Sequence, residues 1–434
     1  MKREKVLLVL IDFENFKKIK LKHSIYYDHR KEHIEELKNL AVSAGANVEE
    51  AIYFKQIKPN TKYFINTGKL EQIKNIVDEN DLELVIFDDE ITPTQQRNLQ
   101  TKLNIKVLDR TALILDIFAQ RAHSSEGKLQ VELAQLNYIL PRLTGRGIEL
   151  SRLGGGIGTR GPGETKLEVD RRKIRNRISM LKKKIARIGI QRDTQRKQRE
   201  EREIFQIALV GYTNSGKTTL LNSTTDADAY VEDRLFSTLD YTIRKINIFS
   251  NLEVLISDTV GFIEKLPHQL IASFKSTLEE VRRSDLLLLI VDISNPYYEN
   301  NIYSVRKVLK EIGVWNKPVI LVFNKIDKVS NAYIEKLKIK YKNVVFISAL
   351  KKKGISELYS RIKKFIEKHY INIVVRIPYV ESRLISFIYN NCQVLDRKDL
   401  EDSTVLNLNV SPRYSSVLAK YLYRESESSK ANIS

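Results

Sequence analysis

The chain has 434 residues, enough for two to four domains, and its 29% charged and 42% hydrophobic residues are typical of a globular protein. Lysine and arginine number 73 against 54 aspartates and glutamates, so the formal net charge is +19 and the expected partner is an acidic polymer, nucleic acid first. The single cysteine, Cys392, excludes an intramolecular disulfide and a cysteine metal site. No run approaches the ~18 apolar residues of a membrane span, which argues against membrane insertion and for a cytoplasmic protein.

Residues 1 to about 110 alternate short apolar runs with helical patterns. The runs that predict strands lie at 6–11, 84–87 and 105–108, and the predicted helices lie at 35–40, 70–77 and 93–103. This alternation predicts a small parallel α/β domain. The segment NTGKL at 66–70 is too short for a phosphate-binding loop, so no second nucleotide site is evident here.

From 111 to 203 the pattern predicts a helical arm. Leucines at 133, 136, 140 and 143 form one apolar face, and a glycine-rich basic loop follows at 145–165. A second apolar seam then recurs at heptad-like spacing and predicts a coiled-coil-like helix, pairing within one chain or between two; we expect a monomer. The seam residues are Leu167, Ile174, Ile178, Leu181, Ile185 and Ile188. Its other faces are crowded with arginine and lysine, which either are simply solvated or contact phosphates.

From 204 to about 371 short apolar runs typical of buried parallel strands return. They lie at 207–210, 254–256, 286–291, 319–323 and 344–347. From 372 to 434 a smaller α+β module is expected, βαβα-like, with strands at 374–377 and 405–410 and a disordered polar tail.

The segment GYTNSGKT at 211–218 fits the phosphate-loop pattern G-x-x-x-x-G-K-[ST] and lies between a predicted strand and a predicted helix, as that pattern requires. Glycines at 211 and 216 let backbone N–H groups close around a phosphate. Lys217 is expected to reach the β- and γ-phosphates, and the Thr218 hydroxyl to ligate Mg²⁺. The predicted contacts are Gly211, Tyr212, Thr213, Asn214, Ser215, Gly216, Lys217 and Thr218.

The segment DTVG at 258–261 begins at the end of the predicted strand LEVLIS. Asp258 suits the outer shell of Mg²⁺, and Gly261 can bring its N–H to the γ-phosphate. A strand-terminal aspartate in a plain turn is the alternative. We assign nucleotide contacts to Asp258, Thr259, Val260 and Gly261.

The segment NKID at 324–327 also follows an apolar run. Asp327 can accept hydrogen bonds from N1 and N2 of guanine, a pair of donors that adenine does not offer. In the segment SAL at 348–350 a backbone N–H can meet guanine O6. The predicted base contacts are Asn324, Lys325, Ile326, Asp327, Ser348, Ala349 and Leu350. This ordered set predicts a site for GTP and GDP.

Between the phosphate loop and Asp258 lies LFSTLDYTIR, at 235–244. A nucleotide-sensing loop commonly supplies a second hydroxyl ligand to Mg²⁺ at this point. Thr238 and Thr242 are both candidates, and position alone does not choose between them.

Several long motifs make the chain similar to the HflX family of translational GTPases. These are IFDDE at 86–90, VLDRTALILDIFAQRA at 107–122, EGKLQVELAQL at 126–136, GGGIGTRGPGETKLE at 154–168, FSTLD at 236–240 and DTVGFI at 258–263. The resemblance implies that Thr238 joins Thr218 as a protein ligand of Mg²⁺, and that nucleotide contacts include Phe236, Ser237, Thr238, Leu239 and Asp240. It also implies an N-terminal α/β domain, a helical arm, binding to ribosomal RNA of the large subunit, and a role in splitting or rescuing stalled ribosomes.

The predicted fold is therefore α/β, with a P-loop GTPase domain at 204–371. Before it lie an α/β domain at 1–110 and a helical arm at 111–203, and after it the small module at 372–434. The expected catalytic residues are Lys217, Thr238 and Gly261, while Phe262 stands where many GTPases carry a water-orienting glutamine, which predicts slow intrinsic hydrolysis. Asn214 either helps to hold K⁺ beside the phosphates or is an ordinary loop residue. The alternative function is a nucleotide-regulated RNA-binding protein whose turnover is incidental.

Overall fold

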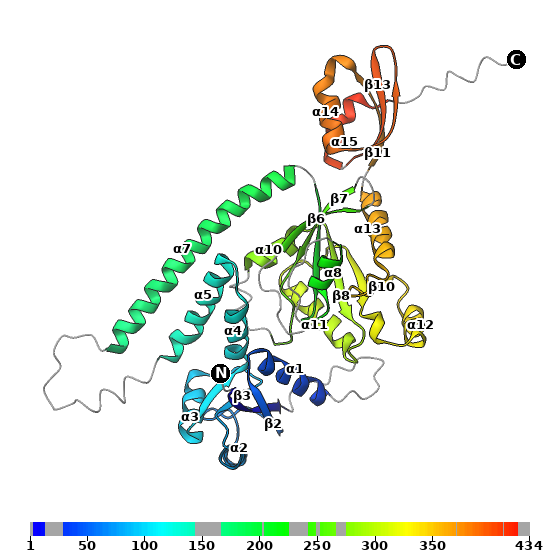
Figure 1. The fold of residues 1–434 in the computed structure, drawn as a ribbon. Coiled ribbons are helices and arrows are strands. Elements are labelled where there is room, and N and C mark those ends of the chain that lie inside the picture. The colour runs from blue at the N-terminus through cyan, green and yellow to red at the C-terminus, as the bar shows by residue number, and fades with distance from the viewer. Residues whose placement is uncertain are drawn as a thin grey trace.

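The computed structural model describes residues 3–13, 29–143, 166–201, 204–224, 242–248, 252–265, 275–369, 371–410 and 412–423. Three separate sheets follow one another along the chain, and a pair of helices forms an arm beside the first two (Figure 1). The predicted α/β fold class is confirmed.

The N-terminal part is a parallel sheet with helices on both faces. Its elements are β1 (Lys5–Phe13), α1 (His29–Ser43), β2 (Asn47–Gln56), α2 (Thr67–Glu79), β3 (Leu84–Phe87), α3 (Pro93–Leu103), β4 (Lys106–Asp109) and α4 (Arg110–Arg121). The strand order is β2-β1-β3-β4, with every pair parallel. One face of the sheet packs on α1 and α4, and the other packs on α2 and α3. Both faces of β1 are therefore buried, which explains its unbroken apolar sequence.

The strand β2 was missing from the sequence-based prediction. It pairs only with β1 at the edge of the sheet, and its residues are mostly half-exposed or exposed. Glutamates at 49 and 50 interrupt its apolar residues, so it lacks the continuous run that marks a central strand. The predicted strand at 105–108 was off by one residue at each end.

The arm consists of α5 (Ser125–Arg142) and α7 (Lys166–Glu201), which lie antiparallel (Figure 1). Leu133 of α5 packs against Ile178 and Leu181 of α7, with the half-buried Ile174 and Ile185 at the border. Within the described residues the predicted seam thus pairs inside one chain.

No helix in the ranges described by the structure is long and apolar enough to cross a membrane.

The middle part is a six-stranded sheet in the order β10-β9-β8-β5-β7-β6, parallel except for the edge strand β6. Its elements are β5 (Phe205–Gly211), α8 (Lys217–Thr224), β6 (Thr242–Ile248), β7 (Leu252–Asp258), α10 (Lys275–Arg283), β8 (Leu286–Asp292), α11 (Tyr298–Glu311), β9 (Val319–Asn324), η1 (Ile326–Lys328), α12 (Asn331–Lys340), β10 (Val344–Phe346) and α13 (Ile355–His369). Helices α8 and α13 cover one face, and α10, α11 and α12 cover the other. The sheet core is therefore closed on both sides, and the strand ends are left to carry the site.

The C-terminal part is a three-stranded antiparallel sheet in the order β11-β13-β12, packed on α14 and α15. Its elements are β11 (Ile371–Pro378), η2 (Tyr379–Glu381), α14 (Ser382–Asn391), β12 (Gln393–Asp399), β13 (Ser403–Val410), α15 (Pro412–Leu418) and η3 (Ala419–Tyr421). The α+β character is as predicted, but the βαβα order was wrong. The prediction missed β12, whose sequence QVLDRKD is charged because it lies at the sheet edge. This part lies across the middle sheet from the N-terminal part (Figure 1).

Candidate functional site

The predicted nucleotide contacts that fall within the described residues gather at one edge of the middle sheet. Strands β5, β7, β8, β9 and β10 are parallel, so their carboxyl ends meet there. The phosphate-loop segment follows β5, and Asp258 and Asn324 are the last residues of β7 and β9. Ser348 comes shortly after β10. Ligands of open α/β sheets bind at this edge as a rule.

The loop between β5 and α8 needs residues without side chains at two points. A Cβ on Gly211 would lie 2.3 Å from the carbonyl oxygen of Ile290, and a Cβ on Gly216 would lie 2.2 Å from Nδ2 of Asn324. Gly216 also has φ +91°, a left-handed backbone conformation that disfavours other residues. Asn214 adopts φ 59°, which asparagine tolerates better than most side chains. The loop therefore has the close backbone course that a phosphate cradle requires.

Lys217 begins α8, and its ammonium group lies under this loop. Nζ donates to the carbonyl oxygens of Gly211 at 3.3 Å and Tyr212 at 3.0 Å, and the residue is buried. Burial lowers the pKa of Lys217 to about 8, although nearby Asp258 raises it; Lys325 adds to the lowering. A buried cation at the N-terminus of a helix suits an anionic ligand.

Thr218 and Asp258 face each other across the start of α8. The Thr218 hydroxyl donates to Oδ2 of Asp258 at 2.6 Å, and Asp258 is fully buried. A hydroxyl and a carboxylate held together in this way fit Mg²⁺, which takes one or two protein oxygens along with phosphate and water. In the ranges that the structure describes, no group of three or more His, Cys, Asp and Glu residues could hold a metal. The pair is thus suited to an ion that a bound nucleotide helps to hold.

Asn324 ties the phosphate loop to the loop after β10. Its Nδ2 donates to the carbonyl oxygen of Ser215 at 2.9 Å, and its Oδ1 accepts from the Ala349 N–H at 3.0 Å. Asn324 is 2% exposed, so both hydrogen bonds are shielded from water. Asn324 therefore holds the phosphate loop and the loop after β10 together.

The other residues of the NKID and SAL segments lie around this brace. Lys325 has a left-handed backbone, and its Nζ lies 2.7 Å from Oδ2 of Asp292 at the end of β8. The Ser348 hydroxyl donates to the Asp327 carboxylate. Partial burial raises the pKa of Asp327, but this hydrogen bond and nearby lysines lower it more, so the carboxylate stays ionised and able to accept from a base. Ile326 is half-buried, and Leu350 is exposed.

The DTVG segment lies directly against the phosphate loop. The Thr213 N–H donates to the Phe262 carbonyl at 2.8 Å, and the Phe262 N–H donates to the Gly211 carbonyl at 3.0 Å. A Cβ on Gly261 would lie 2.9 Å from Cα of Thr213 and 3.1 Å from Nζ of Lys217. Gly261 is therefore next to the cation that would meet the terminal phosphate, while the Phe262 side chain is buried and has no polar group to offer a water molecule.

Not every predicted site residue can be placed. Thr238 and the rest of the set 236–240, and the glycine-rich loop at 145–165, lie outside the described residues. Thr242, the alternative to Thr238, is the first residue of β6 and pairs with Asp258 across the antiparallel ladder. Thr259 donates its hydroxyl to the Leu209 carbonyl at 2.7 Å, and Val260 packs against the N-terminal core.

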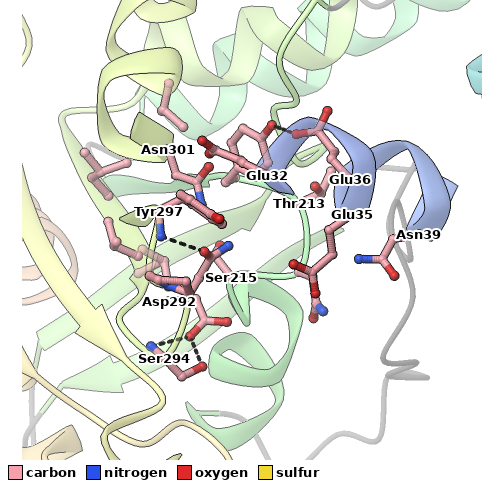
Figure 2. A pocket seen from close by; sticks show the side chains of 18 residues that line it. Glu32, Glu35, Glu36, Asn39, Thr213, Ser215, Asp292, Ser294, Tyr297 and Asn301 are labelled. Atoms are coloured by element: carbon pink, nitrogen blue, oxygen red, sulfur yellow. Dashed lines mark hydrogen bonds between the residues drawn. The ribbon is translucent and has the colours of Figure 1, made fainter. Parts of the chain in front are cut away.

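Residues of the N-terminal part also reach the site, and the sequence-based interpretation did not assign them. A cavity of about 290 Å³ separates α1 from the phosphate loop and the start of α11 (Figure 2). Its N-terminal wall carries Glu32, Glu35, Glu36 and Asn39. Burial raises the pKa of Glu32 to about 7, and Glu264 and Glu36 add to the rise while a hydrogen bond from Asn300 opposes it. No local sequence signal marks these residues as part of a nucleotide site, because α1 precedes the phosphate loop by about 170 residues.

These features define a P-loop nucleotide-binding domain: the strand order, the loop after β5, and the Thr218–Asp258 pair beside that loop. Within this class, the NKID and SAL loops distinguish GTPases. Four family models match the chain in sequence order. They are described as GTP-binding GTPase N-terminal over residues 31–119, GTP-binding GTPase Middle Region over 121–199, 50S ribosome-binding GTPase over 206–325, and HflX C-terminal domain over 333–432.

Relatives match over most of their own length as well. A GTPase HflX from Caldanaerobacter subterraneus is 49% identical over 84% of this chain and 84% of the relative, and one from Flavobacterium psychrophilum is 43% identical over 92% and 97%. The GTPase HflX of Escherichia coli is 40% identical over 89% of this chain and 91% of the relative. The chain belongs to the HflX family of GTPases, as the sequence motifs had predicted.

Proposed function

We propose that this protein binds and hydrolyses GTP in the cytoplasm and that its nucleotide cycle switches its engagement with the large ribosomal subunit, so that it splits or rescues stalled ribosomes. The observation that carries the GTPase role is the geometry around Asn324, which braces the phosphate loop and the base loop with two buried hydrogen bonds. That brace prepares one edge of the sheet for phosphates and guanine together.

The residues have distinct roles in this proposal. Lys217 neutralises charge on the β- and γ-phosphates, Thr218 and Thr238 ligate Mg²⁺, and the Gly261 N–H contacts the γ-phosphate. Bound Mg²⁺ would supply further charge neutralisation. Asp327 selects guanine by accepting from N1 and N2, and the remaining contacts are those of the segments 211–218, 236–240, 258–261, 324–327 and 348–350.

Hydrolysis in the isolated protein is expected to be slow. Phe262 is 3% exposed and apolar, so it does not orient an attacking water. A partner that organises the segments around Gly261 and Thr238 is then needed for fast turnover. Asn214 is proposed to help hold K⁺ beside the phosphates, and equal hydrolysis rates in K⁺ and Na⁺ would refute that role.

The ribosomal part of the proposal depends on charge. The net charge is +19, and α7 presents exposed cations along the faces that do not pack on α5. These include Arg172, Lys173, Arg175, Lys182, Lys183, Lys184 and Arg187. A basic helix that ends in a glycine-rich segment suits insertion among RNA phosphates. The family model that matches residues 206–325 is described as 50S ribosome-binding GTPase, which supports the large ribosomal subunit as the partner.

The test is GTP hydrolysis with and without purified large ribosomal subunits, with ATP in parallel. We expect strong stimulation that is selective for GTP. A second test uses a variant that lacks residues 154–163. This variant should bind GDP as the unaltered protein does and bind the large subunit more weakly. Lack of stimulation together with unchanged subunit binding by the deletion variant would refute the ribosomal role and favour an RNA-binding protein with incidental turnover.

A further inference from the structure

The segment that follows Gly261 is shared between two parts of the molecule. Ile263 is 2% exposed and belongs to the hydrophobic core formed by β1, α1, α4 and α5 of the N-terminal part and the arm. Val260 and Tyr212 pack against the same core. The DTVGFI segment is therefore anchored in the N-terminal part as well as on the phosphate loop, which it meets through the Thr213–Phe262 hydrogen bond.

Two side chains, the half-buried Tyr212 and the buried Arg110, hold the backbone of Glu264. The Tyr212 hydroxyl accepts from the Glu264 N–H at 3.0 Å, and Nη2 of Arg110 donates to the Glu264 carbonyl oxygen at 2.9 Å. The same Tyr212 hydroxyl donates to Glu36 of α1, and Nη2 of Arg110 donates to the other oxygen of that carboxylate. One phosphate-loop tyrosine and one N-terminal arginine thus hold the backbone N–H and the backbone C=O of the same residue, Glu264, in the segment after Gly261.

Ion pairs surround these contacts to the Glu264 backbone. Arg110 is 3% exposed and pairs with Asp88 at 2.5 Å, and Lys265 reaches Asp88 and Asp89 at 2.8 Å each. Burial lowers the pKa of Lys265, but the two aspartates raise it more, so the ammonium stays charged. Burial raises the pKa of Tyr212 well above its usual range, and Glu36 adds to the rise, so the hydroxyl keeps its proton as a donor. Every charged side chain of this network is paired with an opposite charge of the same network, which gives the contacts to Glu264 a defined geometry.

We propose that Tyr212 and Arg110 are positioning residues for GTP hydrolysis, holding the backbone of Glu264 so that Gly261 stays beside Lys217. This inference rests on the proposed hydrolysis of GTP at the same site. It assigns the N-terminal part a role in aligning the reacting groups, in addition to the fold stability that its core provides.

The physical reason is preorganisation. Gly261 has no side chain to fix it. Phe262 makes backbone hydrogen bonds to the phosphate loop, and its side chain packs in the core of the middle part without any polar contact. The next polar anchor along the chain is the Glu264 peptide, three residues beyond Gly261. Loosening that anchor lets the Gly261 N–H sample positions away from the γ-phosphate, and a displacement of about 1 Å is enough to slow a reaction by up to about 100-fold.

The experiment compares Tyr212→Phe with Tyr138→Phe in the full chain. Each change removes one tyrosine hydroxyl that donates to a carboxylate, but Tyr138 bonds Asp109 at 2.9 Å, within the N-terminal part and arm. Tyr212→Phe should lower kcat for GTP by about fivefold to tenfold and leave KM within about twofold, the result expected when an interaction matters mainly in the transition state. Tyr138→Phe should lower the free energy of unfolding and leave kcat unchanged.

A second pair of variants repeats the comparison with arginines. Arg110→Lys should lower kcat by more than Tyr212→Phe, because one ammonium group does not reproduce the contacts to Asp88, Glu36 and the Glu264 carbonyl. Arg142→Lys is the control, since Arg142 bonds Asp109, Gln96 and the Ile91 carbonyl, all in the N-terminal part. Amide hydrogen exchange of the peptide spanning 260–265 should speed up in the Tyr212 and Arg110 variants only.

The outcomes separate the two proposals. If the unaltered chain hydrolyses GTP and Tyr212→Phe and Arg110→Lys match it in kcat and in exchange at 260–265, the positioning role is refuted while the GTPase remains. The same holds if the control variants lower kcat equally, because a general loss of stability would then explain the effect. No hydrolysis by the unaltered chain would refute the proposed function itself, and with it any role of these residues in the reaction.

Discussion

The two ends of the candidate site are built differently. At the base end, Asn324, Ser348, Ala349 and Asp327 brace one another with hydrogen bonds that stay inside the middle sheet and its loops. At the phosphate end, the segment after Gly261 is held by Tyr212 of the phosphate loop together with Arg110, Asp88 and Asp89 of the N-terminal part. Guanine recognition is therefore local, whereas the alignment for hydrolysis depends on contacts between parts of the chain.

This difference indicates how binding and turnover can be regulated separately. A change in the N-terminal part, such as an RNA contact on the arm, can reach Gly261 through the Glu264 peptide without touching the base loop. Coupling of this kind requires that the two states differ in the contacts they make. Such contacts are present between the N-terminal part and the segment after Gly261, in the ion pairs that join residues 88, 89, 110 and 265. Among the described residues, the base end takes no part in these ion pairs.

The largest expected effect lies at the phosphate end. Lys217→Ala removes the buried ammonium group that lies beside Gly261, and we expect kcat for GTP to fall by about 100- to 1,000-fold, because a fixed charge at the γ-phosphate acts mainly in the transition state. Single-turnover hydrolysis with saturating GTP measures this directly. Retention of more than about a tenth of the rate would contradict the role of Lys217. Lys336→Ala, at an exposed position of α12 away from the site, is the matched control.

The base end is tested by Asp327→Asn. The carboxylate that would accept from guanine N1 and N2 is replaced by an amide with one acceptor and two donors, so GTP affinity should fall by about 100-fold. Xanthine carries an oxygen where guanine carries the N2 amine, and the new amide can donate to it, so XTP affinity should rise. Competition binding with GTP, XTP and ATP measures both changes. If the comparison of the two ends is right, Tyr212→Phe leaves this ranking of bases unchanged.

The sequence singled out the residues of the base end, but it did not assign the contacts between the N-terminal part and the segment after Gly261. The segments at 211–218, 324–327 and 348–350 are recognisable because backbone geometry and base recognition restrict residue type over short spans. Central strands such as β8 were evident from unbroken apolar runs, whereas the edge strands β2 and β12 carry charges and were missed. The contacts of Arg110 to Glu264 join residues 154 apart, so no local pattern shows them. Asp88 and Arg110 do lie in the family motifs IFDDE and VLDRTALILDIFAQRA, which is the one signal that pointed to them.

The pH dependence of nucleotide binding sharpens the assignment of Lys217. Burial lowers the pKa of Lys217 to about 8 in the protein without nucleotide, and bound phosphates would raise it again. Below pH 8 the ammonium is already charged, so affinity for GDP should be constant; above pH 8 binding must take up a proton, so affinity should fall by about tenfold between pH 7 and pH 9. Titration of GDP binding across this range gives the slope. The slope should disappear in Lys217→Ala, and a slope that persists there would assign the pH dependence to another group.

The smallest expected effect concerns the wall of the cavity that faces the phosphate loop. Glu32 of α1 accepts from Nδ2 of Asn300 in α11 at 2.9 Å, and burial, aided by Glu264 and Glu36, raises its pKa from 4.5 to about 7. Because the pKa is raised on folding, the folded protein holds the proton more tightly than the unfolded chain. Stability should therefore fall as pH rises from about 4.5 to about 7 and stay lower above pH 7.

Glu32→Gln keeps an acceptor for Asn300 and removes this titration. Since Glu32 is partly exposed, solvent screening limits the gain, and we expect about 1 kcal/mol of added stability above pH 7, or about 2 °C in the unfolding midpoint. The gain should be much smaller near pH 5, where Glu32 is still protonated in the folded protein. Thermal unfolding of both proteins at pH 5 and pH 8 measures it. A gain of equal size at both pH values would mean that packing, and not the charge between α1 and α11, sets the stability of this interface.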